Sequence, residues 1–349
     1  MAIQTVCGII KKESAGITSP HEHIFIELSP FFDEHFVKDC PNPATAKVTM
    51  DKLGILYRDP YAIRDDLVID DFKTQKKEIS RFKTAGGQTI VDATMPGIGR
   101  NPRLLKKISE QTGVNVVMGT GFYVYSSHPQ EMKNMTENEI AELMVKEIQE
   151  GVGDTGIKAG IIGEIGISEI FNEEERRVLR ASAVAHKKTG NSVLVHINPW
   201  TTNGIEAAKI LLDAGVDPKK ITISHVDVEN NVEYISELLR LGVYVEFDNF
   251  GKEYYVNREV RNSGYGLFVN DVQRVKCLKR FIDEGYKKQI LCSCDVCLKI
   301  CLRKYGGWGY DHVLTNIVPM MEDEGISKED IALILKENPT EFIDNRKLD

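Results

Sequence analysis

The 349-residue sequence lacks long apolar runs, and no stretch approaches the roughly 18 residues that a membrane-spanning helix needs. Its opening residues, MAIQTVCGIIKK, contain no apolar core of the length found in a signal peptide. Basic residues are not in excess, since 44 lysines and arginines face 52 aspartates and glutamates, for a formal net charge of −8. No basic face for a nucleic acid is therefore expected. These absences predict a cytoplasmic protein with no membrane and no nucleic-acid partner.

The sequence also lacks linkers, low-complexity tracts and internal repeats, which predicts one domain over residues 1–349. Short apolar runs alternate with longer amphipathic ones, as in parallel sheets with helical crossovers. Helices are expected at 172–190 and 231–242, each closed by a glycine. Strands are expected at 18–26, 89–94, 114–121, 159–165, 192–197, 221–226, 243–248 and 290–295. Eight such units predict an α/β fold, a (β/α)₈ TIM barrel, with an additional excursion at about 29–70.

Histidine is scarce, with 8 in the chain, yet two of them flank a glutamate in the stretch TSPHEHIFIEL. Residues two apart in a strand point to the same side, so both imidazoles are expected to face one centre. Polar residues of related chemistry stand near the carboxyl ends of four further expected strands, and these ends meet at one rim in a barrel. The six residues expected at this rim are His21, His23, Glu164, His196, His225 and Asp295.

These six side chains predict a metal site, although a single histidine at a strand end is more often packed or solvated than a ligand. Neutral imidazoles and ionised carboxylates bind Zn²⁺, Mn²⁺ and related ions. Six ligands exceed what one catalytic zinc takes and suit two divalent ions roughly 3.5–4 Å apart. Zn²⁺ is the expected metal, with Mn²⁺ and Co²⁺ as alternatives. We expect one ion on His21, His23 and Asp295, the other on His196 and His225, and Glu164 as the bridge.

Cysteine is unevenly distributed along the chain. Four of the 7 cysteines lie at 292–301. An odd number clustered in this way does not predict the disulfide framework of a secreted protein. Cys294 and Cys297 have the C-x-x-C spacing of some zinc and redox sites. Strand alternation instead directs Cys292 and Cys294 toward the helices, and Cys297 and Cys301 are four apart on the helix expected next. All four are therefore expected to pack as small hydrophobic residues.

Several motifs in order along the chain resemble those of one family. They are GITSPHEHI, IVDATMPGIGRNP (90–102), GTGFY (119–123), KAGIIGEIG (158–166), VHIN (195–198), ISHVD (223–227), FDNFGK (247–252) and GWGYD (307–311). Together they resemble the phosphotriesterase-like family of the amidohydrolase superfamily, including its phosphotriesterase homology proteins and phospho-sugar lactonases. The resemblance implies a metal-dependent barrel hydrolase that forms a homodimer. Many members bridge their metals with a carboxylated lysine, whereas Glu164 stands at that position here, as in the phosphotriesterase homology proteins.

The reaction expected from this set is hydrolysis at a carbonyl or phosphoryl centre by attack of a hydroxide that bridges the two metals. Asp295 is the expected catalytic residue, accepting the proton and passing it to the leaving oxygen. The family resemblance favours a small-molecule lactone, with a sugar lactone, phosphorylated or not, as the substrate. Phosphotriester hydrolysis, other ester hydrolysis, amide hydrolysis and a non-catalytic metal-binding barrel stay open as alternatives.

Of two loops beside the expected rim, the one after the third strand places Tyr123 as a pocket wall, and the one after the seventh strand is rich in tyrosine and cations, which suits an anionic substrate group. The alternative is a solvated loop whose basic residues only promote solubility, because such a loop would have the same composition. Trp308 is a further candidate for the pocket wall. The residues expected to contact substrate are Tyr123, Lys252, Tyr254, Tyr255, Arg258 and Arg261.

Overall fold

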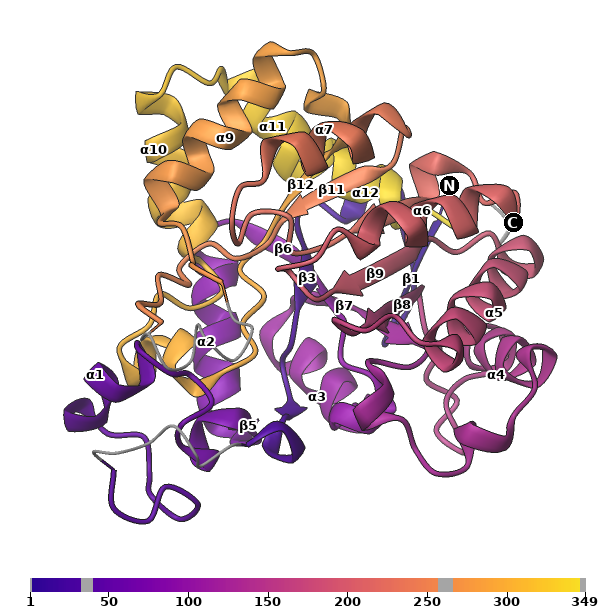
Figure 1. Ribbon diagram of the computed structural model, residues 1–349, viewed down its shortest axis with the longest axis horizontal. Helices are drawn as coiled ribbons and strands as arrows, with labels where there is room; N and C mark the ends of the chain where they lie inside the picture. The colour runs from indigo at the N-terminus through magenta and orange to yellow at the C-terminus, as the bar shows by residue number, and fades with distance from the viewer. Residues whose placement is uncertain (1, 33–39, 257–265, 346–349) are drawn as a thin grey trace.

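The computed structural model describes residues 2–32, 40–256 and 266–345. Eight parallel strands form a nearly closed barrel, with hydrogen-bonded order β3-β6-β7-β8-β9-β10-β11-β12 (Figure 1). The strands are β3 Ile17–Glu22, β6 Gly87–Asp92, β7 Asn115–Thr120, β8 Ile161–Ile167, β9 Val193–Ile197, β10 Ile221–Ile223, β11 Tyr244–Phe247 and β12 Ile290–Cys292. The (β/α)₈ fold predicted from the sequence is confirmed.

Helices follow the strands around the outside of the barrel. They are α2 Phe72–Thr84, α3 Pro102–Thr112, α4 Glu137–Gln149, α5 Glu173–Thr189, α6 Asn203–Asp213, α7 Val232–Arg240, α9 Asp271–Asp283 and α10 Val318–Asp323. Helix α5 shows the local reasons for these bounds. The Asn172 side chain accepts a hydrogen bond from Glu175 N at 3.0 Å, and the helix ends at Gly190, whose φ of 80° is left-handed.

Two strands end earlier than the sequence predicts. Strand β10 ends at Ile223 and β12 at Cys292, so His225 and Asp295 lie just beyond the ladder. Both have left-handed backbones, with φ of 60° and 44°, which cannot continue a strand. The ends of these two strands are therefore irregular where the candidate ligands stand.

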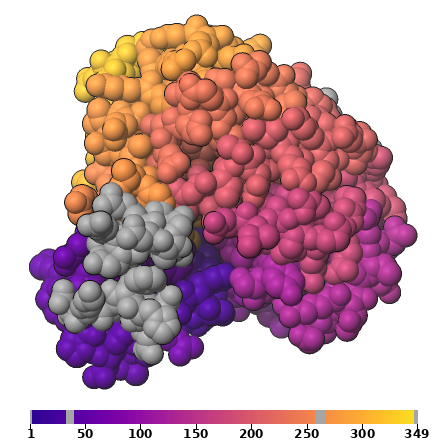
Figure 2. Space-filling model, viewed as in Figure 1, coloured from indigo at the N-terminus to yellow at the C-terminus, as the bar shows by residue number. Residues whose placement is uncertain are grey.

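The expected first strand is also divided. It leaves the barrel after Glu22, and a short strand β4 (Ile26–Glu27) pairs antiparallel with β5 (Val68–Ile69) in a separate sheet. Helix α1 (Leu53–Leu56) lies in the excursion between β4 and β5. This excursion occupies the lower left of the molecule in Figure 1 and forms the indigo surface in Figure 2.

Two apolar clusters stabilise the barrel. The larger one lies between strands and helices and includes Cys292 and Cys294, which pack there as expected. The smaller one fills the interior of the barrel toward its amino end. A hairpin of β1 (Ala2–Thr5) and β2 (Gly8–Lys11) and the short helices α11 (Lys328–Ala332) and α12 (Asn338–Phe342) complete the chain. None of the helices in the described residues is long and apolar enough to cross a membrane.

Candidate metal centre

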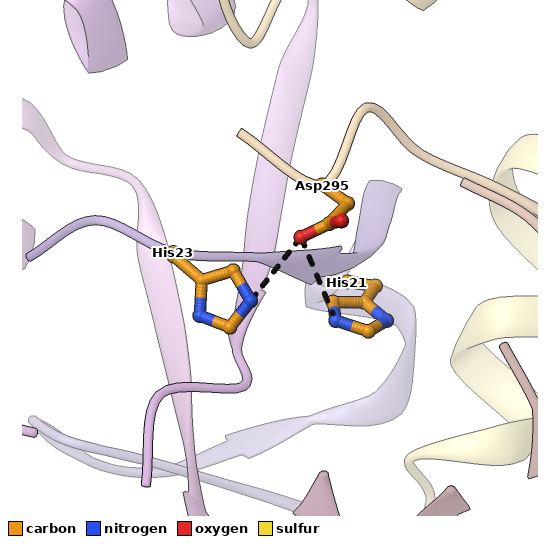
Figure 3. Close-up of side chains that lie close together, drawn as sticks. All are labelled: His21, His23 and Asp295. Carbon is orange, nitrogen blue, oxygen red and sulfur yellow. Dashed lines mark ion pairs between the residues drawn. The ribbon is translucent and has the colours of Figure 1, made fainter. Parts of the chain in front are cut away.

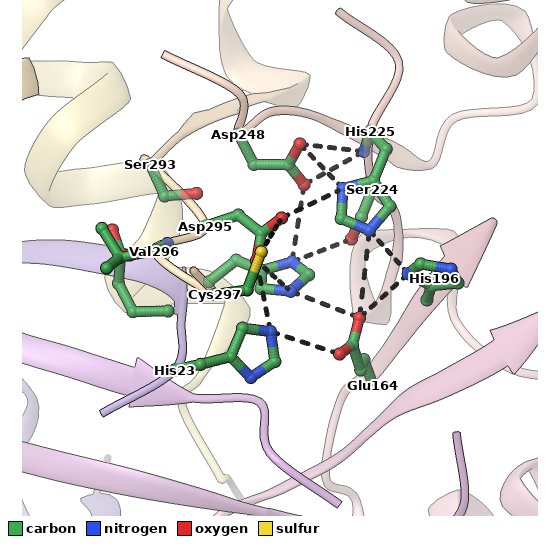
Figure 4. Close-up of polar contacts among 12 residues, drawn as sticks. His23, Glu164, His196, Ser224, His225, Asp248, Ser293, Asp295, Val296 and Cys297 are labelled. Atoms are coloured by element: carbon green, nitrogen blue, oxygen red, sulfur yellow. Dashed lines mark hydrogen bonds and ion pairs between the residues drawn. The ribbon is translucent and has the colours of Figure 1, made fainter. Parts of the chain in front are cut away.

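The six residues predicted at the rim lie together at the carboxyl end of the barrel (Figures 3 and 4). His21 is on β3, Glu164 on β8 and His196 on β9, whereas the other three follow their strands directly. The structure thus brings together side chains from five different strand units. Their role as ligands stays a prediction that the geometry makes specific.

Glu164 is central to the cluster. Its Oε2 atom is 3.3 Å from His21 Nε2 and 3.2 Å from His196 Nδ1, and its Oε1 atom is 3.3 Å from His23 Nε2. His225 Nε2 lies 2.7 Å from His196 Nδ1. A carboxylate that contacts imidazoles assigned to both ions has the geometry of a bridging ligand.

Asp295 joins the cluster on the side of β3. Its Oδ1 atom is 3.2 Å from His23 Nε2 and 3.9 Å from His21 Nε2. Figure 3 shows the two imidazoles and this carboxylate directed at one point. The ligand atoms of these three residues all lie within 4.8 Å of one another, as do those of His21, Glu164 and His225.

Two buried atoms in the cluster indicate that a cation belongs there. His21 Nε2 and Glu164 Oε2 make no hydrogen bond to any described residue, although both are fully buried. A buried polar atom without a hydrogen bond is costly, and imidazole nitrogens with carboxylate oxygens are the donors that Zn²⁺, Mn²⁺ and Co²⁺ accept. The donor set fits two divalent ions.

The second nitrogen of three imidazoles is held by a polar partner. His23 Nδ1 lies 2.9 Å from Thr94 Oγ1, and His225 Nδ1 lies 3.0 Å from Asp248 Oδ1. His21 Nδ1 lies 3.3 Å from Glu246 Oε2. Partners of this kind fix ring orientation and tautomer in metal sites. Glu246 and Asp248 were not predicted as part of the site, although two acids in the buried run VYVEFD were an available signal.

Nearby charges keep the two carboxylates of the cluster ionised, which is the form that binds a metal. Burial opposes ionisation of Glu164, but the nearby imidazoles of His21, His196 and His23 outweigh it and hold the pKa below its usual value. Burial likewise opposes ionisation of Asp295, and the nearby Lys252 ammonium keeps the pKa of Asp295 well below its ordinary range. Both carboxylates are therefore negatively charged at neutral pH.

A cavity of about 320 Å³ opens onto the cluster. Its walls are largely aromatic and apolar, a composition typical of small-molecule sites. Tyr123 forms one side, with its hydroxyl 3.3 Å from His196 Nε2. The aromatic residues that line it are Phe31, Tyr61, Tyr123, Trp200, Tyr254 and Phe268.

Of the other residues predicted to contact substrate, some line the cavity and others do not. Lys252 and Tyr254 line the cavity, and Lys252 Nζ donates to Asp295 Oδ2. Tyr255 is 74% exposed and Trp308 47% exposed, and neither is among the lining residues. Trp308 instead stacks on His312. Arg258 and Arg261 lie outside the described residues, so their predicted contact with an anionic group stays a prediction.

The segment after β12 differs from its prediction. Cys297 and Cys301 do not lie on an α-helix: a 3₁₀ turn at Lys299–Cys301 stands there. The Asp66 carboxylate accepts a hydrogen bond from Ile300 N at 2.8 Å and fixes this turn. Cys297 lines the cavity, and both cysteines pack against the larger apolar cluster as expected.

Two histidines outside the cluster also have polar partners. His128 Nδ1 lies 2.6 Å from Glu174 Oε1, and His128 Nε2 lies 2.7 Å from Tyr123 O. His312 Nε2 lies 2.7 Å from Asp271 Oδ2. Their carboxylate partners come from other elements and were not evident from local sequence.

Barrel fold and buried cluster together define a metal-dependent hydrolase. The sequence model of the phosphotriesterase family matches residues 1–343, and the chain belongs to this family. The resemblance expected from the sequence motifs is thus confirmed.

Individual relatives cover almost the whole chain. An N-acetyltaurine hydrolase from Xenopus tropicalis is 37% identical over 353 residues, which cover 98% of this chain and 97% of the relative. A resiniferatoxin-binding protein from Rhodobacter sphaeroides is similar in structure, with a TM-score of 0.94, 30% identity and coverage of 98% and 95%. The phosphotriesterase homology protein from Escherichia coli, with phosphate in its active site, gives a TM-score of 0.78 at 29% identity, covering 95% of this chain and 99% of that one.

Proposed function

We propose that this protein is a binuclear metal-dependent hydrolase that cleaves the amide bond of a small, anionic N-acyl compound. The observation that carries the proposal is the placement of Asp295, whose Oδ1 faces the histidine cluster while Oδ2 accepts from Lys252 Nζ at the cavity wall. Similarity to N-acetyltaurine hydrolase over nearly the whole chain supports an amide as the bond cleaved.

Two divalent ions on the six predicted ligands would supply a polarised carbonyl and a water of lowered pKa. The chain's own contribution is proton transfer and orientation. Asp295 can accept the proton of the attacking water and deliver it to the leaving nitrogen, which an amide needs because an amine anion is a poor leaving group. Tyr123, whose ring also lies 4.6 Å from that of His196, positions one side of the acyl group.

Lys252 gives the cavity its affinity for an anion. Burial opposes its charge, but the Asp295 carboxylate raises the pKa of the Lys252 ammonium well above its ordinary value. A permanent ammonium in an apolar cavity favours a sulfonate, carboxylate or phosphate on the substrate. We therefore expect the substrate to carry one such group beyond the scissile bond.

Lactone hydrolysis is the second candidate, and the sequence resemblance favours it. A lactone needs the same proton transfer, with an alkoxide as the leaving group. Phosphate in the active site of the similar Escherichia coli protein supports a phosphorylated sugar lactone in particular. A phosphotriester or another ester is the remaining alternative on the same site.

The test uses the full chain, stripped of metal and reloaded with Zn²⁺, Mn²⁺ or Co²⁺. N-acetyltaurine is compared with neutral N-acetylethanolamine by amine release, and aldonolactones with and without phosphate by a pH indicator. We expect N-acetyltaurine to be hydrolysed, with kcat/KM at least about tenfold above that of the neutral amide. Asp295→Asn serves as the inactive control.

Three outcomes contradict the proposal in different ways. Turnover of lactones with no amine release would replace the amide by the lactone function. Equal rates for the charged and the neutral amide would remove the anion preference. Binding of two ions with no turnover of any amide, lactone, ester or phosphotriester would indicate a non-catalytic barrel.

A further inference from the structure

The barrel has a seam where its two end strands meet. Seven neighbouring pairs of strands share backbone ladders, and among the described residues none joins β3 to β12. Backbone amides at the edge of a sheet need other partners when they are buried. At this seam a side chain supplies them.

Glu22 crosses the seam. Its Oε1 atom accepts from Cys294 N at 3.0 Å, and its Oε2 atom accepts from Val296 N at 2.8 Å. The Ser19 hydroxyl also donates to Oε1, at 2.7 Å. Glu22 is fully buried, so neither contact is shared with bulk water. One carboxylate therefore holds two amides of the segment that follows β12.

Asp295 stands between those two amides. Its φ of 44° is a conformation that costs an ordinary residue on the order of 1–3 kcal/mol unless neighbours impose it. Hydrogen bonds on both flanking residues impose it here. Figure 4 shows Val296 and Asp295 on this segment, with the Asp295 carboxylate directed into the histidine cluster.

We propose that Glu22 is a positioning residue for the metal centre, fixing Asp295 in its ligand geometry across the seam between β3 and β12. The inference rests on the proposed metal site. His21 and His23 flank Glu22, so a three-residue segment supplies two imidazoles and also orients the third member of their set, Asp295. The H-E-H motif thus supplies two ligands of one predicted ion and positions the third.

The alternative is that Glu22 has a purely structural role. The chain contains a second buried glutamate with similar contacts that serves as a comparison. Glu78 on α2 is also buried and accepts from two backbone amides of the segment after β12, Arg303 N and Lys304 N, each at 3.2 Å. This contact lies farther along the chain than the candidate ligands. Loss of either carboxylate should cost stability, but only Glu22 should affect the metals.

The experiment compares Glu22→Gln with Glu78→Gln in the full-length protein. Glutamine keeps the size of the side chain but turns an amide group toward one backbone N–H, which leaves that N–H without an acceptor. Metal-free protein is titrated with Co²⁺, followed by visible absorption and by bound-metal analysis. Thermal unfolding of the metal-free proteins measures the structural cost.

We expect both variants to unfold at lower temperature than the parent. Glu22→Gln alone should weaken Co²⁺ binding by about 10–100-fold, alter the Co²⁺ spectrum and lower kcat with KM little changed. If Glu22→Gln does not fold, Ser19→Ala, which removes one contact to Glu22, should change Co²⁺ affinity and spectrum in the same direction by less.

Parental Co²⁺ affinity and spectrum in Glu22→Gln would overturn the positioning role, as would an equal loss of Co²⁺ binding in Glu78→Gln. Absence of Co²⁺ binding by the parent protein would instead contradict the proposed metal centre itself. The two failures are therefore distinguishable.

Discussion

The amino end of the barrel is closed mainly by apolar side chains and holds a buried carboxylate, Asp344, beside Lys12, whereas its carboxyl end gathers several buried carboxylates and histidines. At the amino end Ile3, Phe342 and Ile343 pack against the interior of the strands. The one buried cation there, among the described contacts, is Lys220, and it donates to three main-chain carbonyls, Glu341 O at 2.8 Å, Phe342 O at 3.1 Å and Asp344 O at 2.8 Å.

At the carboxyl end the same strands lead into left-handed residues and several buried carboxylates. Such features lower stability unless a ligand compensates them. The comparison teaches that one end of each strand stabilises the fold while the other end is free to carry chemistry. Substitutions at the two ends should therefore affect different measurements.

Loss of the bridging carboxylate should have the largest effect. Glu164→Ala is expected to remove at least one ion and to lower kcat by about 10³-fold or more, because several kcal/mol of transition-state stabilisation disappear with the metal. Hydrolysis rates and bound-metal analysis check this. Glu110→Ala, which changes an exposed acid on α3, is the control and should retain activity. Full activity of Glu164→Ala would refute the bridging role.

A core substitution at the amino end should give the opposite pattern. Phe342 is fully buried, so Phe342→Ala is expected to lower the free energy of unfolding by about 3–5 kcal/mol through lost burial and a residual cavity. Urea denaturation measures the loss, with Ile9→Ala on the exposed hairpin as control. The folded fraction should keep its kcat/KM. A specific loss of activity at unchanged stability would show that the two ends are not separable.

Metal affinity should depend on pH through the histidines. Burial opposes protonation, but contact with Glu164 and other carboxylates raises the pKa of His21 well above its ordinary value in the metal-free protein, and Asp248 raises that of His225. A metal must therefore displace a proton, so affinity falls as pH falls. Where binding of an ion displaces one histidine proton, we expect its affinity to fall by up to about tenfold for each pH unit. Titrations with Zn²⁺ at fixed pH values check this, and pH-independent affinity would contradict it.

The smallest effect is expected from the hydroxyl beside His196. Tyr123→Phe removes the group 3.3 Å from His196 Nε2 and should lower kcat/KM or metal affinity by roughly tenfold. Tyr125→Phe, on the same loop but 45% exposed, should behave like the parent protein. Identical kinetics of both variants would show that this contact does not orient the imidazole.

The barrel and the members of the cluster were predictable from sequence for one reason. A polar side chain at the end of a buried strand is costly, so its repeated occurrence in five strand units indicates a shared function. The left-handed backbones at His225 and Asp295 were not predictable, because contacts with Asp248 and Glu22 from other strands impose them. Local sequence contains no trace of such contacts.

Details of the cavity were less predictable still. Tyr254 and Tyr255 are neighbours with the same side chain, yet one lines the cavity and the other is exposed. The expected helix after β12 is absent because Asp66 and Glu78, more than two hundred positions earlier, hold that segment. Propensity cannot anticipate a conformation set by distant partners.

The seam between β3 and β12 also has a consequence for how the chain folds. The Glu22 carboxylate and the Cys294 amide are 272 positions apart, so this contact can form only after the intervening units are in place. Half of the candidate metal ligands meet at that same junction. Binding of the ion expected on His21, His23 and Asp295 would thus report completion of the barrel, and a fragment lacking either end strand could not assemble that half of the site.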